Sequence, residues 1–183
     1  MRPSRAPLLA FARASVRKAR HQARQGGNWG DAVITIGIRA APRVVTFAVY
    51  DTDAKTVINV EEIRIPAAFG TPDGLKYLRS NLLDVLREFR VERAGVRLTE
   101  PSAQSLSIDR VQIEGVIQEA FASSELSAYF AGPIATGAAR LGIERTRFKP
   151  LADGEDGYGI ENWGKMSKEE REAILYAMGA ENA

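Results

Sequence analysis

The stretch AVITIGIRAAPRVVTFAVYD, residues 32–51, decides the fold, because it contains two β-strands separated by a short turn. Residues 32–38 alternate bulky apolar side chains with small ones, which is typical of a buried central strand. The Ala-Ala-Pro sequence at residues 40–42 then interrupts the strand, and the apolar residues 44–50 indicate a second one. The sheet is therefore expected to begin as an antiparallel pair.

The rest of the chain adds a third strand and then alternates helices with strands. A polar turn at residues 51–53 leads into a third strand at residues 56–65. Further elements are expected as follows: a helix at 71–89, a strand at 94–99, a helix at 108–122, a strand at 126–132, a short helix at 133–141 and a final helix at 167–179.

Three local signals mark where helices begin. Pro72 occupies the first helical position of the 71–89 segment, where its missing amide hydrogen has no cost. Ser107 can cap the following helix by accepting a hydrogen bond from a free amide. Ser167 and Glu170 form the sequence signature of a capping box at the start of the final helix.

This order of elements, β-β-β-α-β-α-β-α-α, predicts an α/β fold. We expect a five-stranded mixed sheet, in which an antiparallel three-stranded meander extends two parallel strands, with helices on both faces. Residues 31–183 would form this single domain, and residues 1–30 a separate N-terminal arm, helical or disordered. No apolar run approaches the length of a membrane span, so a cytoplasmic protein without membrane contact is expected.

The composition excludes several kinds of chemistry. The chain has no cysteine, which excludes disulfides and thiolate metal sites. Its one histidine, His21, lies in the arm, so a histidine-rich zinc site or a Ser-His-Asp centre inside the domain is not expected.

The charge is unevenly distributed along the chain. Residues 1–30 contain seven of the 25 basic residues and no acid, whereas the remaining 18 bases face 23 acids, giving +7 and −5. Four arginines recur at helical spacing and would follow one face of a helix. Such a row can track a phosphate backbone; a solvated tail, a docking helix for a protein partner and a targeting presequence are the alternative interpretations. The basic residues concerned are Arg13, Arg17, Lys18, Arg20 and Arg24.

Four segments resemble the ribonuclease H-like superfamily, and in particular its RuvC-like branch, which includes small bacterial proteins. They are VITIGIRAAPRVVTFAVYD, RAGVRLTE, IDRVQIEGVIQEAF and EREAILYAM, and the resemblance extends over about residues 31–180. It implies that active members hold two magnesium ions with three or four carboxylates, which come from the first strand, the fourth strand and the last helix.

This chain departs from that pattern. The position of the first-strand aspartate is occupied by Arg39, which would repel magnesium but can bind a phosphate with two parallel hydrogen bonds. The fourth-strand acid falls at Thr99, and only Glu172 on the last helix matches the expected place. The blander interpretation is that Arg39 is a surface arginine at a strand end and that Glu172 is a solvated acid near a helix start. If the chain is an active nuclease, its candidate acids are Glu172, Glu100, Glu114 and Glu169.

Three functions follow as hypotheses. The favoured one is a non-catalytic nucleic-acid-binding module, a pseudoenzyme without metal or cofactor that works within a larger complex. It would bind DNA or RNA phosphates through Arg39 and the five basic residues of the arm. The alternatives are a divergent Mg²⁺-dependent nuclease and a protein-interaction scaffold that docks through the arm.

Overall fold

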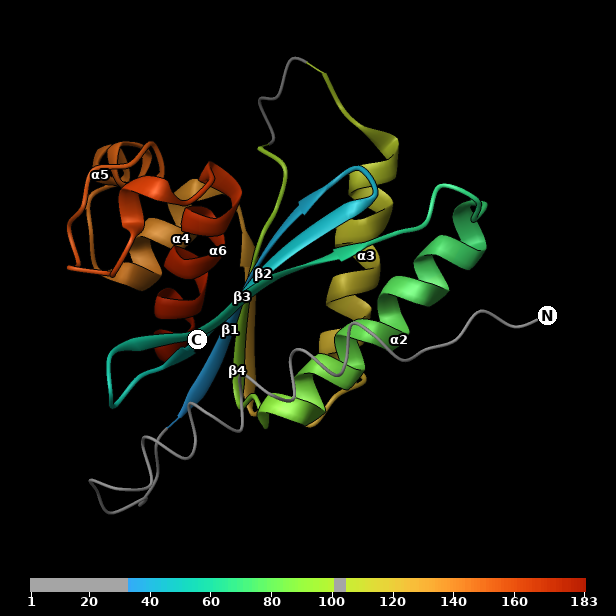
Figure 1. The fold of residues 1–183 in the computed structure, drawn as a ribbon, viewed down its shortest axis with the longest axis horizontal. Coiled ribbons are helices and arrows are strands. Elements are labelled where there is room, and N and C mark those ends of the chain that lie inside the picture. Colours follow the sequence, from blue (N-terminus) through green and yellow to red (C-terminus); the bar gives the residue numbers. More distant parts are fainter. Residues whose placement is uncertain (1–32, 101–104) are drawn as a thin grey trace. The chain divides into compact units, whose positions relative to one another are not determined.

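Five strands form one mixed sheet in the order β3-β2-β1-β4-β5 (Figure 1). The computed structural model describes residues 33–100 and 105–183. Strands β1, β2 and β3 pair antiparallel, and β1, β4 and β5 pair parallel, which confirms the predicted meander and mixed sheet. The strands are β1 Ile34–Ala41, β2 Val44–Asp51, β3 Thr56–Arg64, β4 Arg93–Arg97 and β5 Ala128–Gly132.

Helices cover both faces of this sheet. Figure 1 shows α2 and α3 on one side and α4, α5 and α6 on the other. The helices are α2 Thr71–Phe89, α3 Ile108–Ala122, α4 Ile134–Leu141, α5 Arg145–Ala152 and α6 Lys168–Gly179, with short 3₁₀ turns at Trp163–Lys165 and Ala180–Asn182. No helix in the described residues is both long and apolar enough to cross a membrane.

The predicted helix starts are confirmed. Helix α2 begins with Pro in its first turn. The Ser107 hydroxyl accepts a hydrogen bond from the Arg110 amide at 3.3 Å. At α6, the Glu170 amide donates to the Ser167 hydroxyl, and the Ser167 amide donates back to the Glu170 carboxylate, which completes the capping box.

Strand β4 ends two residues earlier and β5 begins two residues later than the sequence predicts, and two other elements differ more. Strand β1 does not stop at residue 38 but continues to Ala41, because Ala40 and Ala41 pair with Val45 and Val44 of β2. Pro42 therefore lies in the turn and not in the strand. Helix α5 was not predicted, since its sequence RTRFKPLA is rich in charge and contains Pro150; its burial of Phe148 and Leu151 against the core stabilises it.

Helix α6 lies directly on the centre of the sheet because two glycines leave room for it. A Cβ atom on Gly37 of β1 would come within 2.0 Å of the Ala173 carbonyl oxygen. A Cβ atom on Gly95 of β4 would come within 2.8 Å of the Tyr176 carbonyl oxygen. The Thr35 hydroxyl donates to the Ala177 carbonyl at 2.7 Å, on the same face. The helix and strands are therefore in backbone contact, which fixes the height of the α6 side chains above the sheet.

Candidate functional site

The site is built on a short sequence that occurs in both central strands. Gly37-Ile38-Arg39 in β1 and Gly95-Val96-Arg97 in β4 lie side by side, and Arg39 pairs with Arg97 in the parallel register. Alternate residues of a strand point to the same face, so each arginine lies on the face that its glycine opens to α6. Two guanidiniums are thus brought together near the carboxyl end of the central strands.

Glu172 of α6 lies between these two arginines. Its Oε2 accepts from Arg39 Nε at 2.5 Å and lies 3.1 Å from Arg97 Nη1, while its side chain is only 2% exposed. Burial and the neighbouring Arg97 guanidinium lower the pKa of Arg39, whereas Glu172 raises it. An arginine stays charged under such conditions, so the cluster holds two cations and one buried anion.

Two further carboxylates fix the chain that leaves β4. Glu114 of α3 accepts hydrogen bonds from the Thr99 amide and hydroxyl at 3.1 and 2.9 Å, and from Arg110 Nε at 2.7 Å. Glu100 accepts from the Ile134 amide at 2.8 Å, at the start of α4, and lies 3.9 Å from Arg97. Each acid is therefore used to hold an amide or a guanidinium in place.

A cavity of about 400 Å³ opens at this end of the sheet. Its lining comes from the ends of β1 and β4 and from the first turn of α3, and comprises Arg39, Arg97, Thr99, Glu100, Ser105, Ser107 and Arg110. Ligands of open α/β sheets bind outside the carboxyl ends of their strands, which is where this cavity lies. The donors of its walls suit an anion.

Known structures share this architecture. RuvC from Thermus thermophilus matches with a TM-score of 0.62 and 15% identity, over 82% of this chain and 94% of that one. The same RuvC in complex with a Holliday junction substrate matches with a TM-score of 0.59 and 15% identity, over 82% and 93%. The yeast mitochondrial Holliday junction resolvase Ydc2 matches with a TM-score of 0.50 and 14% identity, over 80% and 78%.

The fold is the ribonuclease H-like fold of RuvC. Comparison of the sequence with protein-family models and with curated proteins gives no match. The likeness is therefore one of architecture, and the chemistry of the site has to be argued from this chain's own residues.

The side chains of this site do not suit the two magnesium ions that the resemblance implies. The Glu172 oxygen that a metal would need is already shared by two guanidiniums. Glu100 caps α4 and Glu114 is occupied by Thr99 and Arg110. In residues 33–100 and 105–183, no three acidic or histidine side chains are grouped so as to hold a metal ion.

Four of the residues singled out in the sequence lie at this site: Arg39, Glu100, Glu114 and Glu172. The expectation of a surface arginine at a strand end was wrong for Arg39, which lies within β1 with its side chain 14% exposed. The interpretation of Glu172 as a solvated acid near a helix start was also wrong, because its side chain is buried. Glu169 is exposed on the first turn of α6 and takes no part. The predicted arm residues lie outside the described residues, namely Arg13, Arg17, Lys18, Arg20 and Arg24.

Sequence reasoning missed Arg97 and Arg110. The signal for Arg97 was present: the Gly-x-Arg sequence of β1 recurs in β4, and adjacent parallel strands can place such repeats in register. Arg110 precedes Glu114 by one helical turn, a spacing that allows an ion pair. Neither arginine could be distinguished from the other basic residues of the sequence before the structure placed it at the cavity.

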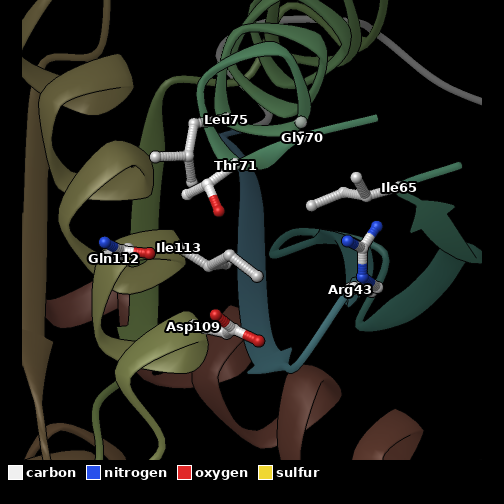
Figure 2. Close-up of a pocket in the computed structure, with 9 residues that line it drawn as sticks. Arg43, Ile65, Gly70, Thr71, Leu75, Asp109, Gln112 and Ile113 are labelled. Atoms are coloured by element: carbon white, nitrogen blue, oxygen red, sulfur yellow. The ribbon is translucent and has the colours of Figure 1, made fainter. Parts of the chain in front are cut away.

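A second, smaller hollow lies between the first turns of α2 and α3 (Figure 2). In the view of Figure 2, Asp109 and Ile113 of α3 face Arg43 and Ile65 across it. Its volume of about 40 Å³ suits one or two water molecules and not a substrate. Arg43 donates to the carbonyls of Pro66 and Phe69, so its guanidinium serves the loop before α2.

Proposed function

We propose that this chain is a non-catalytic RuvC-like module that binds nucleic acid through its phosphates, within a larger assembly. The observation that carries the proposal is the position of Arg39 and Arg97, whose guanidiniums both contact Glu172. The carboxylate that would serve a metal is neutralised from within the chain. The cavity beside it presents arginines in place of metal-ligating acids.

The chemistry of these side chains supports phosphate as the ligand. Guanidinium groups bind phosphate oxygens through two parallel hydrogen bonds and remain charged at any physiological pH. The hydroxyls of Ser105 and Ser107 line the same cavity and can donate to the same oxygens. No base-reading element is evident in this set of donors, so we expect affinity without strong sequence preference.

Cleavage and binding assays on the same substrates test this proposal. Four-way junction, duplex and single-stranded DNA and RNA would be incubated with the protein in Mg²⁺ or Mn²⁺, and binding measured by fluorescence anisotropy at low salt. We expect binding without cleavage. Arg39→Gln combined with Arg110→Gln should weaken binding about tenfold or more, because two phosphate contacts are lost. Arg147→Gln is the matched control, since Arg147 pairs with Glu155 at the surface.

Two results would overturn the proposal. Metal-dependent cleavage that Glu172→Gln abolishes, in a variant whose circular dichroism spectrum is unchanged, would make the chain a nuclease. A complete lack of affinity for every nucleic acid at low salt would leave only the role of a protein-interaction scaffold.

A further inference from the structure

Helix α3 and the residues just before it carry most of the large apolar side chains that the fold leaves exposed. In residues 33–100 and 105–183, five large apolar residues are more than a third exposed, and three of them lie at the start of α3. Leu106 is 65% exposed, Ile108 69% and Val111 40%. A single exposed apolar side chain needs no explanation, but a contiguous group on one element indicates a surface that binds another molecule.

The exposed apolar residues of α3 form a stripe along the helix. Its buried side, which includes Ile113, Ile117 and Phe121, packs into the domain. At about 100° per residue, four exposed positions lie within about 60° of one another on the side that faces away from Ile117. They are Ile108, Val111, Gly115 and Ala122, and together with Leu106 we call them the α3 face.

Gly115 lies in the middle of the α3 face and has no evident role within the fold. A Cβ atom at this position would meet no other atom within 4 Å in the part of the chain that the structure describes. Glycine weakens a helix relative to alanine, and nothing in the described packing of α3 offsets that cost. A glycine on an exposed helix face does allow another backbone to approach closely. The position is therefore suited to contact with a second helix.

The α3 face carries no charge, which favours a protein over a nucleic acid as its partner. None of its five residues is ionisable. The carboxylate of Glu119, four residues after Gly115, accepts hydrogen bonds from Arg79 of α2 at 2.5 and 3.0 Å. Nucleic acid is bound chiefly by basic surfaces, which this face lacks. Two copies of an uncharged face can meet without repulsion between like charges.

The two ends of the α3 face differ in size, so that the face complements itself. Leu106, Ile108 and Val111 lie at the beginning of the helix, whereas Gly115 and Ala122 lie at its middle and end. If two copies of α3 pack antiparallel with Gly115 against Gly115, the bulky end of each lies over the small end of the other. Such pairing of one surface with itself is the usual geometry of a twofold interface.

An exposed aromatic ring lies beside the small end of the face. Tyr129 of β5 is 45% exposed, and its ring centroid lies 5.7 Å from that of Phe121 in α3. Tyrosine is enriched at protein–protein interfaces. In the antiparallel arrangement, Tyr129 of one copy lies at the same end of the helix pair as Leu106 of the other, which extends the apolar contact.

We propose that the α3 face binds a second copy of this chain, forming a symmetric dimer in which the two α3 helices pack antiparallel and cross at Gly115. The partner is a second copy because the face is uncharged and its bulky and small ends complement each other. This inference does not depend on the proposed function, since none of the residues of the α3 face lines the cavity.

The mass of the full chain in solution tests the inference. Sedimentation equilibrium from about 1 to about 100 μM should show twice the 20.0 kDa mass of one chain as the concentration rises. Val111→Asp should weaken the dimer about tenfold or more, because its carboxylate would be buried without a partner. Tyr158→Asp, at an exposed aromatic residue in the loop after α5, is the matched control and should leave the dimer unchanged. A chain that stays monomeric throughout, or a dimer that Val111→Asp leaves intact, would overturn the inference.

A substitution at Gly115 separates dimer formation from folding. Gly115→Leu favours the helix and adds a side chain whose Cβ meets no atom, so the dilute, monomeric chain should stay folded. At high concentration the same side chain would keep the two helices apart, and we expect the dimer to be lost. Circular dichroism at low concentration and sedimentation at high concentration measure the two effects. A folded variant that dimerises as the parent does would contradict a crossing at Gly115.

Because the chain has no cysteine, introduced cysteines report the arrangement directly. Mild oxidation should join two copies of Gly115→Cys, since this position lies on the twofold axis where the backbones approach most closely. Ile108→Cys should be joined to Ala122→Cys when the two variants are mixed, and not to itself. Ser80→Cys, at an exposed position of α2, is the control and should remain monomeric. Joining of Ile108→Cys to itself would refute the antiparallel arrangement.

Binding of nucleic acid by the same variants tests the main alternative occupant. Val111→Asp should leave the affinity of the monomeric chain for single-stranded and duplex DNA unchanged, because the α3 face would contact only the second copy. Fluorescence anisotropy at protein concentrations below those at which the dimer forms measures this. A loss of affinity of about tenfold in Val111→Asp, without loss in Tyr158→Asp, would assign the face to nucleic acid and overturn the inference.

Discussion

Glu172 is a buried acid whose carboxylate is paired with two arginines of the same chain. Its Oε2 contacts the guanidiniums of both Arg39 and Arg97. Buried ion pairs add little net stability when complete, because desolvation offsets their attraction. Removing one partner is different, since the charges that remain are buried and unpaired.

Glu172→Gln should lower the free energy of unfolding by about 3 kcal/mol, because it leaves two buried guanidiniums without their anion. Urea unfolding followed by circular dichroism measures the change. Glu169→Gln, on the exposed first turn of the same helix, is the control and should stay within about 0.5 kcal/mol of the parent. Equal stability of the two variants would show that the arginines do not depend on Glu172.

At the scale of single residues, the sequence identified Arg39 as unusual but not the residues that surround it in the fold. Arg39 was recognised because it occupies the place where the sequence resemblance led us to expect an acid. Arg97 and Glu172 are 58 and 133 positions away from it, and only the strand register and the docking of α6 bring them together. The burial of Glu172 also could not be foreseen, since an acid near a helix start is usually solvated.

Among the secondary-structure elements, the contact of α6 with β1 and β4 depends on Gly37 and Gly95. Gly37→Ala should lower the free energy of unfolding by about 3 kcal/mol or more, because its Cβ would clash with backbone atoms of Ala173 and Ala177 that cannot move independently. Chemical denaturation measures this.

The control for that substitution is another glycine-to-alanine change. Gly115 lies within α3, and its Cβ would meet no atom within 4 Å. Gly115→Ala should therefore raise stability by about 0.5–1 kcal/mol, through helix propensity alone. Similar effects at the two positions would contradict the close packing of α6 on the sheet.

The pair formed by Arg79 and Glu119 joins α2 to α3 and predicts a pH effect. The hydrogen bond from Arg79, and then that from Ser123, lowers the pKa of Glu119 from 4.5 to about 2. A carboxyl whose pKa is depressed in the folded state stabilises the fold above its unfolded pKa. This contribution is therefore present above pH 4.5 and is lost as the pH falls towards 2.

An NMR titration of the Glu119 carboxyl carbon tests this. Arg79→Gln should raise its pKa towards the ordinary value, while Arg87→Gln, which removes a separate surface pair with Asp84, should leave it unchanged. Added salt should weaken the shift, since the pair is exposed. A Glu119 midpoint that does not respond to Arg79→Gln would exclude the pair in solution.

The sequence predicted most elements because their local signals agree with their packing. The capping residues of α3 and α6 and the alternation of β1 and β2 are local features. Helix α5 was not predicted because it lacks such local signals. It is stabilised instead by the burial of Phe148 and Leu151. The extension of β1 to Ala41 depends on pairing with β2, which no local pattern specifies.

Across the whole molecule, charge is divided between a basic first segment, residues 1–30, and a mildly acidic remainder. If the first segment contacts phosphates, replacing Arg13, Arg17, Arg20 and Arg24 with Gln in the full chain should reduce the salt dependence of nucleic acid binding. The slope of log K against log salt should fall by up to about 4, because each phosphate contact contributes about 0.9. Binding isotherms over a range of salt concentrations measure it. An unchanged slope would show that this segment makes no phosphate contact.

The overall architecture was predictable because the order of elements leaves few topologies open. A meander followed by alternating helices and strands restricts the sheet to a mixed one with helices on both faces. The sequence could not specify which helix lies on the central strands, because that depends on Gly37 and Gly95 facing the same way.

The position of α6 on β1 has a consequence for how the protein is made. Strand β1 is covered by a helix synthesised more than a hundred residues later, as the separation of 133 between Arg39 and Glu172 shows. Until α6 has been synthesised, the sheet has a bare face and two guanidiniums without their anion. Contacts between residues so far apart slow folding, so we expect chaperones to engage the unfinished chain until α6 emerges.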